Sequence, residues 1–214
     1  MTYPNACKGL EKIHYAEIML IISTILVSIC EAITDEDGFN ISLDDMSPVF
    51  MIVIIVVLAI GAILAAVADI MNLVGLKKAS KDSGLFLIPF YVTLVLLIVD
   101  IGAGIFLATE HNVVVSEIVE AFKEIIETVQ MVIVITTSMK MAKSLNGINH
   151  VKTSKLMLTF VIISIAVSFI AGLMSVFIEG AGAISEGIYH VLETVSFIIY
   201  LVYVDKTIKF LEEN

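Results

Sequence analysis

Residues 47–71, "SPVFMIVIIVVLAIGAILAAVADIM", decide the fold of this chain. The only charged residue in this stretch is Asp69, and the stretch is longer than the roughly 20 residues that an α-helix needs to cross a bilayer. Residues 156–177, "LMLTFVIISIAVSFIAGLMSVF", carry no charge at all. Of the 214 residues 59% are apolar and 16% are charged, whereas about a quarter of the residues in a soluble domain are charged. The composition therefore predicts an integral membrane protein.

Six apolar segments divide almost the whole chain between them, and the loops that connect them are short. They cover residues 15–33, 48–74, 85–108, 118–139, 156–178 and 184–204. We therefore predict an all-α integral membrane protein with six transmembrane helices in a single polytopic domain, residues 1–214. With so little chain outside these segments, we expect its function to reside in the membrane, in the loops or in a partner.

The positive charges indicate how the helices are oriented. The chain has no arginine, and all of its 12 lysines except Lys123 lie in the N-terminal segment, the second and fourth loops and the C-terminal segment. The other loops are acidic. Because lysine-rich loops stay in the cytoplasm, we expect both termini to be cytoplasmic, and we expect the membrane to be a prokaryotic inner membrane.

The two cysteines fall on opposite sides of the membrane in this topology, since Cys7 is near the cytoplasmic end and Cys30 near the outer end of the first helix. They are not expected to form a disulfide within one chain. An alternative interpretation of residues 1–30 is a signal segment that ends in "LVSIC", as in a lipoprotein. Ile29 stands before Cys30 where a small residue is expected, which disfavours that interpretation.

Three similar segments suggest an internal repeat. "VGLKKASK", "TSMKMAKS" and "YVDKTIKF" follow the second, fourth and sixth apolar segments. Aligning their lysines places Glu127 over Glu193, whereas the first copy has Leu64. This period predicts three parallel helical hairpins, residues 8–81, 82–147 and 148–214. The alternative is that the orientation rule alone places lysine at the end of each inward-going helix.

Acidic residues recur at helical spacing within the apolar segments. Glu117, Glu120, Glu124 and Glu127 fall within an arc of about 80° on one helix. We predict that the residues nearest the membrane boundary form an outward-facing acidic vestibule, and these are Glu117, Glu120, Glu179 and Glu186. For these four residues, the alternative is an ordinary solvated helix end.

Deeper acids are candidates for a cation site, because a carboxylate that faces lipid is costly and intramembrane acids usually face protein or water. The alternative is a set of internal hydrogen-bonded polar groups that fix the register of the helices. Oxygen ligands with one imidazole suit hard or borderline cations such as Mg²⁺, Ca²⁺ or Mn²⁺. The predicted cation-binding residues are Asp100, Glu124, Glu127, His190 and Glu193.

These patterns predict permeation or coupled transport of protons or of a metal ion. A non-transporting scaffold or sensory subunit that acts through a partner is the alternative, and an intramembrane enzyme that uses the carboxylates or a metal is a third. The chain has no His-Glu-x-x-His zinc motif and no Gly-x-Ser-x-Gly nucleophile turn. The sequence leaves the cofactor unknown. The expected partners are the lipid bilayer and a cation, with a second copy or another protein left open, and not nucleic acid.

Overall fold

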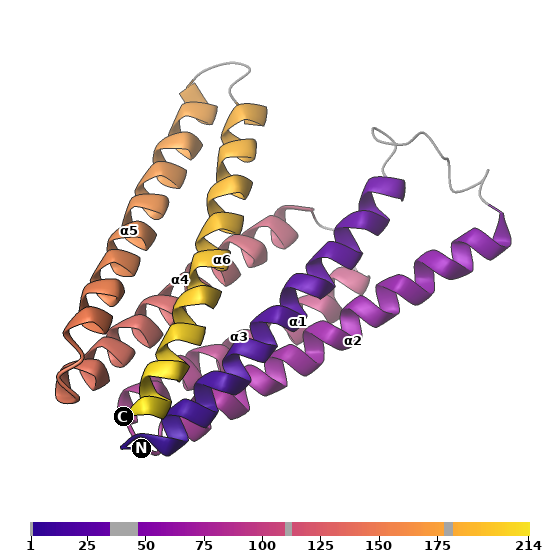
Figure 1. Ribbon diagram of the computed structural model, residues 1–214. Coiled ribbons are helices and arrows are strands. Elements are labelled where there is room, and N and C mark those ends of the chain that lie inside the picture. The colour runs from indigo at the N-terminus through magenta and orange to yellow at the C-terminus, as the bar shows by residue number, and fades with distance from the viewer. Residues whose placement is uncertain (1, 35–46, 110–112, 178–181) are drawn as a thin grey trace.

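The computed structural model describes residues 2–34, 47–109, 113–177 and 182–214, and Figure 1 shows that these residues are almost entirely helical. No strand occurs among them. Each predicted apolar segment coincides largely with one α-helix, which confirms the all-α class. The elements are α1 (Pro4–Thr34), α2 (Pro48–Ala79), the short 3-10 helix η2 (Gly84–Phe86), α3 (Leu87–Thr109), α4 (Val113–Ser144), α5 (Ile148–Phe177) and α6 (Gly182–Glu213).

Helix α1 begins at Pro4, well before the apolar segment predicted from residue 15. A proline fits the first helical position because its missing N–H has no intrahelical partner there. The Asp82 carboxylate in the second loop caps this end, accepting hydrogen bonds from the backbone N–H groups of Asn5 (2.6 Å) and Ala6 (2.8 Å). The extra turns carry a buried apolar face of Ala6, Leu10 and Ile13. Packing therefore extends the helix beyond the part that hydropathy identifies.

The termini and the second and fourth loops meet at one end of the molecule, which we call the lysine end because these four segments carry 11 of the 12 lysines. Thr2 donates a hydrogen bond to the Asn214 carbonyl oxygen (3.2 Å), and the Tyr3 hydroxyl lies 2.7 Å from Ser144 Oγ. Figure 1 shows both termini side by side at this end. Among the residues whose side chains are described, the largest apolar cluster lies in the half of the bundle nearest the lysine end.

The helices form a closed ring, because each packs on its neighbours in the chain and α6 also packs on α1. The closest helix pair is α1 and α2. A Cβ atom placed on Gly9 would lie 2.5 Å from the Gly75 carbonyl oxygen, and one on Gly75 would lie 2.6 Å from the Gly9 carbonyl oxygen. Only glycine permits that approach. Farther along the same pair, Ser23 donates to the Gly61 carbonyl oxygen (2.8 Å).

The outward-facing surface of the helices is strongly apolar. Four helical stretches within the described residues are long and apolar enough to cross a membrane: Pro4–Cys30, Pro48–Ala79, Ile125–Ser144 and Ile148–Val167. Gly84–Val99 is a shorter apolar stretch. Large side chains such as Ile52, Leu156 and Phe169 are more than half exposed. Exposed apolar surface of this extent is typical of a protein embedded in a membrane.

Candidate cation site

A buried carboxylate lies near the middle of α1. Glu17 is only 6% exposed, and at the rise of an α-helix it lies about 20 Å from the N-terminal end of α1. The charged residue that precedes it on the same helix is Lys12, five residues or about 8 Å away. A buried ionisable side chain among apolar helices is costly and usually serves a function.

Glu17 lies near two other carboxylates that come from different helices. Glu127 on α4 and Asp69 on α2 both act electrostatically on it, and Glu17 in turn acts on the buried Tyr200 of α6. Glu127 is exposed, Asp69 is half-buried and Glu17 is buried. We call Glu17, Asp69 and Glu127 the acidic cluster. The three side chains thus differ in exposure, and Glu17 is the most buried of them.

A hydrogen-bonded network lies one turn from the acidic cluster on the side of the lysine end. Thr93 of α3 donates to Gln130 Oε1 (2.8 Å), and Gln130 Nε2 of α4 donates to Asn72 Oδ1 of α2 (3.2 Å). All three side chains are buried. Asn72 follows Asp69 by three residues and Gln130 follows Glu127 by three, so each pair shares a helix face. The network therefore sets the positions of α2 and α4 that carry the acids.

A second buried group joins α4, α5 and α6 near the lysine end. The His150 ring stacks between Tyr203 and Phe210, with ring centroids 5.6 and 4.8 Å away, and its Nε2 lies 3.1 Å from Thr207 Oγ1. The Tyr203 hydroxyl lies 2.9 Å from Ser154 Oγ and donates to the Ile135 carbonyl oxygen at 3.4 Å. These contacts engage His150 Nε2 and the Tyr203 hydroxyl, and they indicate a structural role.

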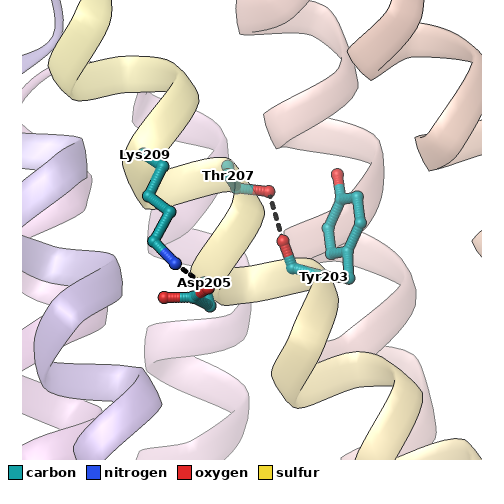
Figure 2. A network of polar contacts seen from close by, with 4 residues as sticks. All are labelled: Tyr203, Asp205, Thr207 and Lys209. Carbon is teal, nitrogen blue, oxygen red and sulfur yellow. Dashed lines mark hydrogen bonds and ion pairs between the residues drawn. The ribbon is translucent and has the colours of Figure 1, made fainter.

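Figure 2 shows α6 close to its C-terminal end, where Tyr203 and the Asp205–Lys209 ion pair project from opposite sides of the helix. Thr207 donates back to the Tyr203 carbonyl oxygen (2.9 Å). Lys209 Nζ lies 2.6 Å from Asp205 Oδ2, and this hydrogen bond raises the pKa of Lys209 above its ordinary value. Both side chains are exposed. This is a solvated pair and not part of the acidic cluster.

Of the residues predicted from the sequence to bind a cation, Glu127 is the one whose side chain the structure describes, and it belongs to the acidic cluster. Asp100 lies on α3, Glu124 on α4, and His190 and Glu193 on α6, but their side chains fall outside the described part of the chain. The same holds for Glu117 and Glu120 on α4 and Glu186 on α6, and Glu179 is wholly outside the described residues. Their convergence with Glu127 stays a prediction.

Glu17 is the residue that sequence reasoning missed. A first helix that starts near residue 15 places Glu17 at the membrane boundary, where an acidic residue is ordinary and does not indicate a site. The signal was present in Pro4 as a helix start and in apolar residues at helical spacing before residue 15. Extending the helix back to Pro4 moves Glu17 close to its midpoint.

Comparison with protein-family models, with curated proteins and with solved structures finds no match to this chain. Its function is therefore argued from its own residues. The buried Glu17 and the two carboxylates near it are the arrangement in the described residues that points most directly to chemistry within the membrane.

Proposed function

We propose that the protein binds a cation at the acidic cluster and conducts or transports it across the membrane. The observation that carries this proposal is the buried carboxylate of Glu17 near the middle of α1, with Asp69 and Glu127 acting on it from two other helices. Three neighbouring carboxylates repel one another when ionised, and either a proton or a bound cation relieves that repulsion. Oxygen ligands of this kind favour protons or hard cations.

The graded exposure of the cluster supports transport over a purely structural role. In this proposal the cation contacts the exposed Glu127 and the half-buried Asp69, and Glu17 is the most buried ligand. By contrast, the polar groups of the Asn72–Gln130–Thr93 network hydrogen-bond to one another, which is how buried polar side chains fix the register of helices. We infer that the network positions the acids and that the acids bind the cation.

In this proposal all six α-helices cross a prokaryotic inner membrane, with the lysine end in the cytoplasm. The meeting of both termini and the second and fourth loops at one end supports it, because six crossings return the chain to its starting side. The cation path in this proposal continues away from the lysine end through Asp100, Glu124, His190 and Glu193. Its opening at the opposite end of the bundle is formed by Glu117, Glu120, Glu179 and Glu186.

The binding step is tested by thermal unfolding of the detergent-purified protein against a panel of monovalent and divalent cations and a series of pH values. We expect one cation, or the proton, to raise the unfolding midpoint of the parent. That rise should disappear in Glu17→Gln and in Glu127→Gln, because each change removes a carboxylate ligand. Glu213→Gln is the matched control, since Glu213 is an exposed residue near the end of α6.

Equal stabilisation of the parent and Glu17→Gln by every cation, in variants that remain helical, would refute the site. Cys7 is a buried thiol near the lysine end, and a thiol is itself a metal ligand. Each measurement is therefore repeated with Cys7→Ser, so that divalent ions bound at this thiol are distinguished from those bound at the acidic cluster.

A further inference from the structure

A thiol and two carboxylates meet at the lysine end, where α1 packs on α6. Cys7 and Glu11 of α1 and Glu212 of α6 each present one atom suited to bind a metal, and these three atoms lie within 4.8 Å of one another. Cys7 is buried, Glu11 is half-buried and Glu212 is exposed. The group therefore extends from the packed interface to solvent, and an ion in solution has access to it.

The spacing of residues along α1 and α6 brings these three side chains together. Cys7 and Glu11 are four residues apart on α1, and Ile208 and Glu212 are four residues apart on α6, so each pair lies on one helix face. Cys7 Sγ lies 3.8 Å from the Ile208 carbonyl oxygen, and the side chains of Ile208 and Leu211 are buried in the core. The hydrogen bond from Thr2 to Asn214 ties the same two chain ends together.

The charges of the same three residues also favour a cation here. Glu11 and Glu212 both act electrostatically on Cys7, so two carboxylates lie close to one thiol. Among the described residues, Lys209 forms an ion pair with Asp205. No lysine ammonium group of the described residues lies within ion-pair distance of Glu11 or Glu212. Lys8 interacts electrostatically with Cys7 and Lys209 with Glu212, and the group of three keeps a net negative charge once the thiol loses its proton.

We propose that Cys7, Glu11 and Glu212 form a binding site for a borderline divalent transition-metal ion of the Zn²⁺ class that bridges α1 and α6. A thiolate selects such ions over Mg²⁺ or Ca²⁺. Metal–ligand bonds of about 2.0–2.3 Å in a tetrahedral site place ligand atoms roughly 3.5 Å apart. Because the three ligand atoms lie within 4.8 Å of one another, small side-chain movements bring them to that spacing. The ion takes the place of the thiol proton, which is released to water.

This site is separate from the acidic cluster. Cys7 precedes Glu17 by ten residues, which is about 15 Å along α1. Whereas the cluster offers oxygen atoms alone, this site adds a sulfur. A metal bound here cross-links the first helix to the last, at the contact that closes the helix ring. The proposal does not depend on whether the protein transports cations.

The test is titration of the full-length, detergent-purified protein with Co²⁺, followed by absorption spectroscopy and by competition with Zn²⁺. Co²⁺ bound to a thiolate gives a sulfur-to-metal charge-transfer band, which reports that Cys7 is a ligand. We expect one equivalent of Co²⁺ to develop the band and Zn²⁺ to remove it. Acidification should weaken binding because protons compete for the ligands.

Variants identify the ligands. Cys7→Ser should abolish the band and Cys30→Ser should keep it. Loss of even an outer-shell partner costs roughly 10- to 100-fold in metal affinity, so Glu212→Gln should raise the dissociation constant at least about tenfold. Glu213→Gln should leave it unchanged. Because Glu212 is exposed, its substitution is not expected to disturb folding, and far-UV circular dichroism checks this for every variant.

Three results would overturn the proposal: no charge-transfer band in the folded parent, a band that survives Cys7→Ser, or equal affinities of Glu212→Gln and Glu213→Gln. The second would assign the thiolate to Cys30, at the far end of α1.

Discussion

Gln130 connects three helices through one side-chain amide, which accepts from Thr93 and donates to Asn72. In Gln130→Leu both partners lose this contact inside an apolar bundle. Hydrogen bonds between transmembrane helices contribute on average about 0.6 kcal/mol and at most about 1.7 kcal/mol. With two bonds lost, we expect the free energy of unfolding to fall by roughly 1–2 kcal/mol.

Chemical unfolding in mixed micelles measures this change, and a double-mutant cycle with Thr93→Val isolates the Thr93–Gln130 bond. Additive effects in that cycle would mean that the bond contributes nothing. Gln130→Leu should also weaken the cation-dependent stabilisation, because the network holds α2 and α4 in the positions that bring Asp69 and Glu127 toward Glu17.

At the scale of single residues, the sequence was informative where an acid interrupted a recognisable apolar helix. It pointed to Glu127 for that reason. It did not point to Glu17, because Lys8, Glu11 and Lys12 lower the hydropathy of the preceding turns and obscure the fact that they are helical. Which acids act on one another depends on helix rotation, and rotation is set by contacts such as Gly9 with Gly75 that join residues far apart in the chain.

At the scale of elements, α3 and α6 decide whether the chain crosses the membrane six times. Among the residues whose side chains are described, α3 contributes the apolar stretch Gly84–Val99 and α6 contributes no long apolar window. If both cross, Lys81, Asn146 and Glu213 lie on the cytoplasmic side, and position 111 lies on the other. We expect Lys81→Cys, Asn146→Cys and Glu213→Cys to react with an impermeant maleimide only from the cytoplasmic face.

His111→Cys should react only from the opposite face. The parent is the control, because Cys7 and Cys30 are both buried and should react slowly from either side. Labelling of His111→Cys from the cytoplasmic face would show that α3 does not cross.

The helices themselves were largely predictable, because each needs only local information: a long apolar run and charged or turn-forming residues at its ends. The observed helix ends differ from the predicted ones where packing or capping by distant residues extends a helix. Asp82 does this at the start of α1. The three-hairpin repeat stays a prediction. The close glycine contact of α1 with α2 has no glycine counterpart in the aligned copies, which carry Ser138 and Val204 where the first has Gly75.

At the scale of the whole molecule, the closed helix ring explains how residues from both ends of the chain come to share sites. The contact of α1 with α6 places Cys7 beside Glu212 and Glu17 near Tyr200. No local pattern encodes a contact between residues about two hundred positions apart. The sequence therefore predicted acids inside a helical bundle, whereas the particular clusters required the packed structure.

Cation flux through the protein in sealed lipid vesicles tests the central claim most directly. The parent, Glu17→Gln and Glu213→Gln are reconstituted at equal density, and influx of the stabilising cation, or of protons, is followed under an imposed gradient. We expect the parent and Glu213→Gln to carry the ion and the folded Glu17→Gln protein to fall to the rate of empty vesicles. Parental flux in Glu17→Gln, or no flux above empty vesicles in the parent for any cation, would contradict a cation path through Glu17.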